Sequence, residues 1–463
     1  MTTPEFDKSM HTAPYATIWG LTWPQVVMMF FHFLIGFVDV WVAGRIGREV
    51  QACMGVMSQA MFFFLVIATA LANGSVAAIS QSAGAGLVRR VERFVGLSVG
   101  LGLLSGILIF VLGLSFEHTF LRLLHIPADV LPIAEYILQI SLYLLPSYYL
   151  FTISNALFRA QKSVTIPLYS MILVTAINTI GDLGFGLGLW GLPNLGYKGI
   201  AWATFVSVLC GTLYNLVMLV RCKLLTRHSL VPWRWTRLAL PYLLLVAWPA
   251  GVMQLVWHSA YMVLYAITAS LPVGSIVAMA GMSAGVRVEA LLFLPGLAFN
   301  FTASILVGHY LGQGRKAEAK RMGYRIVIAG VIVMTVLTGL LWLVVDPVAA
   351  FLAPDPDVQA EAVRYLGWNM AATPFLLVAM ILAGAFTGAG ATLYQAVIFG
   401  SASWLVRLPL AYILGHKVYG TASGIWMAMF ASVLVQCSAM LYFYHCRDWF
   451  RFTLRKPLPA HNA

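Results

Sequence analysis

The sequence repeats itself about halfway along the chain. Four landmarks recur in the same order, each shifted by 225 or 228 residues: Trp23-Pro24 as Trp248-Pro249, Gly84-Ala85-Gly86 as Gly312-Gln313-Gly314, Asp129-Val130 before Pro146 as Asp357-Val358 before Pro374, and Gly199-Ile200 as Gly424-Ile425. Such constant shifts over half a chain are hard to produce by chance. The pattern predicts an internal duplication in which both halves build the same scaffold.

The composition excludes an ordinary water-soluble protein. Apolar residues make up 61% and charged residues 10% of the 463 residues, and the mean hydropathy is +0.86. Soluble domains have roughly 45–50% apolar and 25% charged residues. Because a spanning helix needs about 20 apolar residues, the chain can supply roughly a dozen. We therefore predict an all-α membrane protein with twelve transmembrane helices, and duplicated apolar halves are typical of secondary transporters.

Clusters of charged residues, Gly and Pro separate the expected spans. These are 18–43, 52–78, 94–115, 131–156, 164–188, 199–220, 239–266, 276–306, 324–345, 361–385, 393–415 and 421–443. The longest polar interruption lies between the sixth and seventh spans. We predict four regions: an N-terminal lobe at 1–220, a cytoplasmic linker at 221–238, a C-terminal lobe at 239–446 and a cytoplasmic tail at 447–463.

The basic residues predict the orientation in the membrane. Alternate connections and the two termini hold 20 Lys and Arg residues on one side, against 6 on the other. By the positive-inside rule both termini are cytoplasmic, so the net charge of +12 is a topology signal and predicts no nucleic-acid partner. Residues 1–14 are polar, and we expect no cleavable secretory signal. The five cysteines show no CxxC spacing and predict neither a metal site nor disulfides.

Five residues of the types Asp, Glu, Lys and Arg fall well inside the predicted spans: Asp39, Asp182, Arg287, Glu289 and Arg407. Charges there are costly and should face a cavity or a partner. Arg287 and Glu289 are two residues apart, so they do not share a helix face. Arg407 could neutralise Glu289, and for these three residues we favour a structural ion pair slightly over a role in transport.

Asp39 and Asp182 lie at a similar depth in the first and fifth spans. At the repeat shifts their counterparts are Leu264 and Leu410, so only the first half keeps the acids. Two carboxyl groups that converge in a dry bundle favour the binding of a proton, because desolvation and like-charge repulsion both oppose double ionisation. Asn178 shares a helix face with Asp182. The alternatives are an interfacial Asp39 and a polar patch that only joins helices.

Three further residues have weaker signals. Pro24 removes a backbone hydrogen bond about four turns before Asp39, so it marks either a moving bend or a static kink. Asn155 and Thr204 are polar residues that often serve only to join helices. The GxSxG match at Gly281–Gly285 lies in an apolar helical stretch without the strand that a nucleophile elbow needs. We predict no catalytic residues and no enzyme.

Several motifs occur in a specific order: Trp23-Pro24 with Asp39 and Gly44, Gly84-Ala85-Gly86, Arg159-Ala160-Gln161 with Pro167, Asn178 and Asp182 before Gly199-Ile200-Ala201-Trp202-Ala203-Thr204, Arg287-Val288-Glu289, Gly308 before Gly312-Gln313-Gly314, and Arg407-Leu408-Pro409. Over nearly its whole length the chain resembles the multidrug and toxic compound extrusion (MATE) transporters of the MOP flippase superfamily. The resemblance implies two pseudo-symmetric six-helix bundles in a V shape, which alternate access and exchange drugs for H⁺ or Na⁺.

The resemblance is to the DinF-like branch of that family. It implies a proton or cation site formed by Asp39, Asn178 and Asp182, with matches at Asn155 and Thr204. The NorM-like branch uses acids in the second bundle, one of them on helix ten. This chain has no Asp or Glu between Asn369 and Phe386, which favours the site in the first bundle.

Together these features predict a monomeric exporter in the bacterial cytoplasmic membrane. It would move an amphipathic or cationic organic compound outward in exchange for H⁺, or for Na⁺ bound at Asp39 and Asp182, without a cofactor or another metal. The alternative is a lipid-linked oligosaccharide flippase of the same superfamily. Such flippases line a cavity with several cationic residues, whereas only Arg287 and Arg407 lie well inside the spans here. A membrane enzyme or receptor lacks support, because no catalytic constellation is present.

Overall fold

The computed structural model describes residues 13–123, 126, 130–353 and 355–454. Asp129 of the third sequence landmark, residues 1–12 and the end of the predicted tail at 455–463 lie outside the described residues. Within them the chain is all helical and has twelve helices that are long and apolar enough to cross a membrane. This confirms the predicted fold class. Helices suit a bilayer because they satisfy their own backbone hydrogen bonds.

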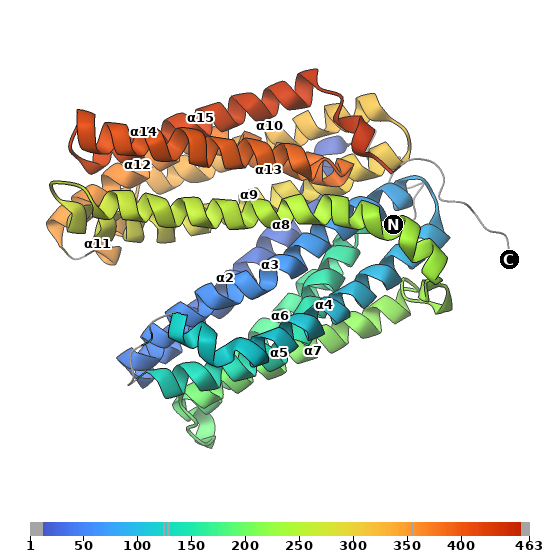
Figure 1. Cartoon of the computed structure of the whole chain (residues 1–463), viewed down its shortest axis with the longest axis horizontal. Coiled ribbons are helices and arrows are strands. Elements are labelled where there is room, and N and C mark those ends of the chain that lie inside the picture. Colours follow the sequence, from blue (N-terminus) through green and yellow to red (C-terminus); the bar gives the residue numbers. More distant parts are fainter. Residues whose placement is uncertain (1–12, 124–125, 127–129, 354, 455–463) are drawn as a thin grey trace. The chain divides into compact units, whose positions relative to one another are not determined.

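The helices are labelled in Figure 1. Those that form or begin the spans are α2 (Pro14–Ile46), α3 (Arg48–Gly84), α4 (Val88–Leu123), α5 (Leu131–Ala160), α6 (Thr165–Gly181), α7 (Tyr197–Arg221), α8 (Trp233–Ala269), α9 (Ser275–Gly312), α10 (Lys316–Trp342), α12 (Pro356–Ala389), α13 (Thr392–Ser401) and α15 (Ala422–Cys446). All twelve overlap a predicted span. The short α11 (Val345–Leu352) between α10 and α12 was not predicted.

Two of the spans contain stretches of wider, π-type helix. One follows α6 at Asp182–Gly186. The eleventh span has two, at Ala402–Arg407 and Ile413–Val418, on either side of the short α14 (Leu408–Tyr412). Such turns are rare and occur frequently at functional sites. They therefore direct attention to Asp182, where the first of them begins.

The two halves share details that reveal the duplication. The loops after α3 and α9 turn at Gly86 and Gly314, whose φ angles of 71° and 79° favour glycine in both places. A methyl group on Gly199 would lie 2.5 Å from the carbonyl oxygen of Phe185, and one on Gly424 would lie 2.5 Å from that of Leu414. In each half, a glycine near the start of the last long helix lets it approach the preceding π-helical stretch.

The described chain divides into two compact units whose boundaries fall at the two Trp–Pro landmarks. One unit comprises Pro24–Ala247, and the other comprises Trp248–Leu454 together with α2 up to Trp23. Helices α2 and α8 therefore each run from one unit into the other. The predicted lobes, which assigned the first span to the N-terminal lobe and the seventh to the C-terminal lobe, stay a prediction.

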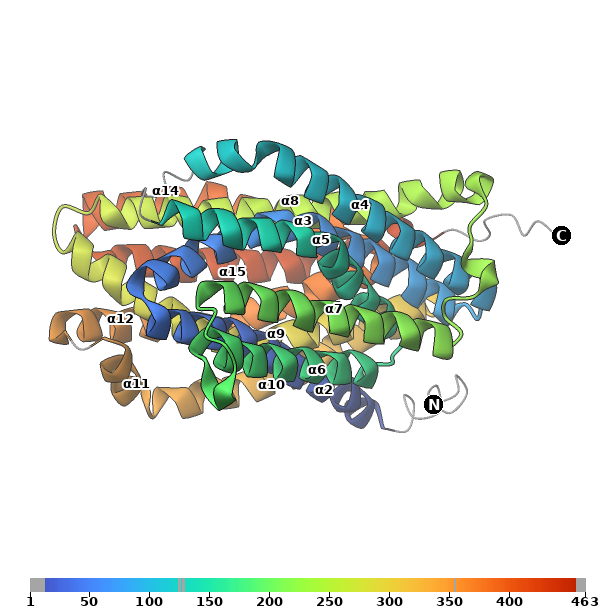
Figure 2. The same cartoon turned by 90° about the horizontal axis from the view of Figure 1, so that it is seen from below.

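Each unit has its own packed interior. In the unit that contains Pro24–Ala247, α4 packs along α5 and α6 packs along α7 (Figures 1 and 2). Tyr149 on α5 is fully buried there, and its hydroxyl donates to the carbonyl oxygen of Phe64, 2.5 Å away. In the other unit, α12 packs against α9 and α15, and buried Tyr365 and Trp426 meet edge to face. The packing of α6 on α7 positions the site described below.

The approach of Gly199 to Phe185 can be tested by adding one methyl group. We expect Gly199→Ala to destabilise the protein by about 1–3 kcal/mol, because α7 must move away from the π-helical stretch. The measurement is the apparent Tm of the purified protein in detergent. Gly100→Ala on α4 is the control, since a methyl group there meets nothing within 4 Å. An unchanged Tm for Gly199→Ala would contradict this account of the packing.

Candidate functional site

Asp39 on α2 and Asp182 at the end of α6 lie in contact. The carboxyl group of Asp39 is within hydrogen-bonding reach of the Asp182 carboxyl group and of the Asn178 side chain. Asp182 and Asn178 are fully buried, whereas Asp39 is partly exposed with its Oδ1 atom buried. We call Asp39 and Asp182 the acid pair. Two helices distant in sequence thus bring two acids to one point inside an apolar bundle.

Few neighbouring groups offset the charge of the acid pair. No N–H or O–H group of the described residues donates to either oxygen of Asp182. Contact with Asp39 is therefore a hydrogen bond only when one of the two carboxyl groups carries a proton. If both were ionised, repulsion at this distance and the loss of hydration would be severe without a cation between them. The arrangement can bind one proton, or one small cation, and release it.

Neighbouring oxygen atoms extend the site. The Asn178 amide donates to the hydroxyl oxygen of Thr204 on α7 at 3.3 Å, and that hydroxyl donates to the carbonyl oxygen of Ile200 at 3.1 Å. The Oδ1 atom of Asn178 is buried and accepts no hydrogen bond. Tyr148 on α5 interacts electrostatically with Asp39. Carboxylate, amide and hydroxyl oxygens are the ligands that hard cations prefer, so the same cluster suits a proton or Na⁺.

Asn155 belongs to a different polar group. Its Oδ1 atom accepts from the amide of Asn215 on α7 at 2.9 Å, and the same amide donates to the Ser154 hydroxyl at 3.0 Å. These hydrogen bonds join α5 to α7 and do not involve the acid pair. Asn215 and Thr204 are eleven residues apart on α7, about 16 Å along a helix. Sequence reasoning missed Asn215, although a lone Asn inside an apolar span is the signal that selected Asn155.

Pro24 lies inside α2, which continues without interruption from Pro14 to Ile46. It stands at the boundary where α2 passes from one compact unit to the other. Just before it, the hydroxyl groups of Thr22 and Thr302 are 2.9 Å apart and completely buried. The role of Pro24 as a moving bend stays a prediction.

The three charged residues of the second half do not form the expected ion pair. Buried Glu289 accepts a hydrogen bond from the Tyr365 hydroxyl at 2.7 Å. Arg407 donates through Nε to Ser432 at 2.9 Å, and its guanidinium lies over the rings of Trp257 and Tyr261. The described residues contain no Glu289–Arg407 ion pair, and the two interact only at longer range.

Arg287 lies on the opposite face of α9 from Glu289 and is exposed. The prediction of an ion pair between Glu289 and Arg407 was wrong because neutral groups satisfy each charge separately. The Tyr365 hydroxyl donates a hydrogen bond to Glu289. The Arg407 guanidinium donates to Ser432 and lies over two aromatic rings.

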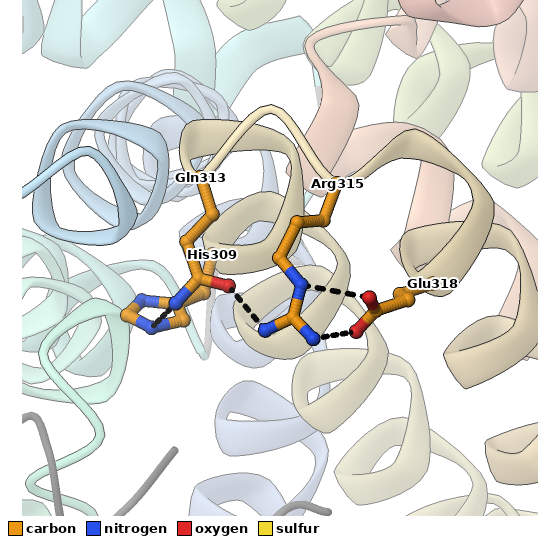
Figure 3. Close-up of polar contacts among 4 residues, drawn as sticks. All are labelled: His309, Gln313, Arg315 and Glu318. Carbon is orange, nitrogen blue, oxygen red and sulfur yellow. Dashed lines mark hydrogen bonds and ion pairs between the residues drawn. The ribbon is translucent and has the colours of Figure 1, made fainter.

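A second polar cluster marks the repeat landmark at Gly312–Gly314 (Figure 3). Arg315 donates through Nε to Glu318 at 2.8 Å and through a terminal nitrogen to Gln313 at 3.4 Å. Gln313 in turn contacts Nε2 of His309 at 3.4 Å. The cluster joins the end of α9 to the first turn of α10, and Glu318 also suits the positive helix start there. It fixes the connection and lies apart from the acid pair in sequence.

Comparisons with known proteins agree with the architecture. The family model described as MatE matches residues 24–183 and 249–413, so each segment begins at the proline of a Trp–Pro landmark. The probable multidrug resistance protein NorM of Thermotoga maritima is 23% identical over 90% of this chain and 89% of its own length. The multidrug resistance protein PmpM of Pseudomonas aeruginosa is 24% identical over 82% of this chain and 80% of its own.

Solved structures show the same fold. A MATE structure in the bent conformation has a TM-score of 0.87 at 18% identity, covering 96% of this chain and 97% of that chain. A MOP superfamily transporter from Pyrococcus furiosus has a TM-score of 0.86 at 18% identity, covering 93% of this chain and 95% of that chain.

The hydrogen bond to Glu289 gives a prediction for the second half. In Tyr365→Phe the buried carboxyl group of Glu289 loses its hydrogen-bond donor, and we expect a loss of about 1–3 kcal/mol of stability. The apparent Tm in detergent should fall clearly. Tyr143→Phe is the control, because Tyr143 is half exposed on α5. Equal melting temperatures for the two variants would contradict a stabilising hydrogen bond between Tyr365 and Glu289.

Proposed function

This chain belongs to the MatE family of membrane transporters, and on that premise we propose that it is a secondary active multidrug exporter that takes up protons in exchange for its cargo. The chain is thus a multi-pass transporter and not an enzyme. The observation that carries the proposal is the contact between Asp39 and Asp182 inside the bundle. Relatives named as multidrug resistance proteins support export of drugs as the activity.

The acid pair couples the two movements by competition. When one proton is shared between Asp39 and Asp182, the pair carries a single negative charge and its carboxyl groups bond to each other. When the proton leaves, two negative charges remain, and a cation is needed to offset them. Protonation on one side of the membrane therefore releases a cationic cargo there, and deprotonation on the other side prepares the pair for the next one. Na⁺ in place of the proton is the alternative coupling ion.

The proposed cargo is an amphipathic organic cation. Its charge is required by the deprotonated acid pair, and Asp39 is the partly exposed member that a cargo can approach. An apolar cluster lies in the same bundle: Met28, Leu144 and Met171 belong to it, and Tyr148, which interacts with Asp39, packs against it. A compact hydrated cation gains little from such walls, whereas an apolar body does.

We place the protein in the bacterial cytoplasmic membrane as a monomer with both termini in the cytoplasm. The 20 to 6 distribution of basic residues supports this orientation. With it, the acid pair lies toward the outer half of the membrane. The helix ends at Arg159 and Arg221 then face the cytoplasm.

The exchange scheme predicts the behaviour of the two acids. In vesicles with an imposed proton gradient, we expect Asp39→Asn and Asp182→Asn each to reduce ethidium transport to the level of empty vesicles, because a neutral amide cannot exchange a proton for a cation. Asp357→Asn, at an exposed position, is the control and should transport normally. The same vesicles are tested with a sodium gradient and with a fluorescent lipid-linked sugar. Wild-type ethidium transport by Asp39→Asn would remove the mechanism, and sugar-lipid flipping would favour the flippase alternative.

The proposed orientation can be checked with native cysteines. Cys222 and Cys446 are exposed at the ends of α7 and α15, whereas Cys53 and Cys437 are buried. A membrane-impermeant maleimide should therefore label inside-out vesicles and leave intact spheroplasts unlabelled. Replacing Cys222 and Cys446 with Ser should remove most of the labelling. Labelling of intact spheroplasts at these two residues would reverse the assigned topology.

A further inference from the structure

The unit that holds the acid pair contains a second polar group nearer the end of the bundle that we assign to the cytoplasm. Ser154, Asn155 and Asn215 form it, and we call them the amide station. Asn215 is completely buried, and its Oδ1 atom accepts no hydrogen bond from the described residues. Asn155 and Ser154 are also at least nine-tenths buried. A buried amide oxygen without a donor is costly unless it binds something, and water is its ordinary partner.

An apolar plug separates the acid pair from the amide station. It consists of Phe151 on α5 and Val174 on α6, which close over Gly211 on α7. A methyl group on Gly211 would lie 2.8 Å from Cε2 of Phe151 and would collide with Val174. Phe151 and Val174 are both buried. Hydrocarbon therefore fills this level of the bundle.

The order along each helix confirms that the plug lies between the two polar groups. On α7, Gly211 comes after Thr204 and before Asn215. On α5, Phe151 is one turn before Asn155, toward the outer end. On α6, which runs the opposite way, Val174 is one turn before Asn178.

Buried hydroxyl groups approach the plug from both sides. Ser207 donates to the carbonyl oxygen of Thr204 at 2.9 Å, on the side of the acid pair. Ser170 donates to the carbonyl oxygen of Gly211 at 3.4 Å, on the side of the amide station. Both serines are at least 99% buried. A buried serine thus lies on each side of the plug, on α7 toward the acid pair and on α6 toward the amide station.

We propose that this line of residues is the route by which the proton leaves the acid pair for the cytoplasm, with the Phe151–Val174 plug as its internal gate. The inference rests on the proposed function. Asn155 and Asn215 do not take up the proton themselves; they hold water that carries it once the plug opens. Arg159, one turn beyond Asn155, is buried and basic, so its charge keeps an excess proton from resting at the amide station. The plug keeps the coupling tight by excluding water when it is closed.

Opening the plug should uncouple the protein. In vesicles loaded with a pH-sensitive dye and without drug, we expect Phe151→Ala to dissipate an imposed pH gradient several-fold faster than the wild type. Adding Asp182→Asn to this variant should abolish the leak, because the acid pair lies on the route. Phe116→Ala, at an exposed position on α4, is the control and should hold the gradient. Val174→Ala tests the same point with a smaller cavity if Phe151→Ala fails to fold.

A second experiment tests whether the amide station speeds proton transfer during export. Asn215→Leu keeps the size of the side chain and removes its amide, so proton-driven ethidium export should slow several-fold while ethidium affinity stays unchanged. Asn215→Ser should restore part of the rate, which a purely structural role would not require.

Folded Phe151→Ala and Val174→Ala proteins that hold the gradient as tightly as the wild type would overturn the inference, as would a leak that survives Asp182→Asn. If Asp39→Asn abolishes export in the same experiments, the proposed function stands and only the exit route fails.

Discussion

The contact between the carboxyl groups of Asp39 and Asp182 inside an apolar bundle is the interaction on which the proposed exchange depends. No basic side chain of the described residues pairs with Asp39 or Asp182, and we propose that a proton or another cation joins them when the helices pack closely. Removing that charge sets the repulsion of two anions against the packing of α2 on α6. We therefore expect the distance between the two carboxyl groups to depend on whether a proton or a cation is bound between them. The position of this contact, at the start of a π-helical stretch, places it where the helix is least regular.

Much of the fold could be predicted because the signals are coarse and repeated. Twenty apolar residues between polar clusters define a span wherever they occur, and the landmarks at Gly199 and Gly424 mark the same close helix approach in both halves. Other features leave no such signal. The unit boundaries at Pro24 and Trp248 depend on which helices pack together, and α11, with eight residues, is too short to be recognised as a separate helix.

The site was only partly accessible from the sequence. A buried charge is rare enough in an apolar span to identify Asp39 and Asp182 as candidates, but their functional roles stay predictions. The structure was needed to show that Asn155 bonds to Asn215 and not to the acid pair. The sequence alone does not indicate which polar residues of different helices contact each other. The same limit explains the expected Glu289–Arg407 ion pair. Opposite charges suggested a contact, whereas the nearby Tyr365 offered the carboxylate a better-placed hydrogen bond.

We propose that cargo displaces a proton from the acid pair, and this exchange can be measured as the release of protons when cargo binds. Purified protein in weakly buffered detergent solution is titrated with ethidium while a pH indicator reports released protons. The account predicts about one proton released for each ethidium bound by the wild type. Asp39→Asn should release none. Binding of ethidium by the wild type with no release of protons would contradict the account, because cargo and proton would then occupy the protein independently.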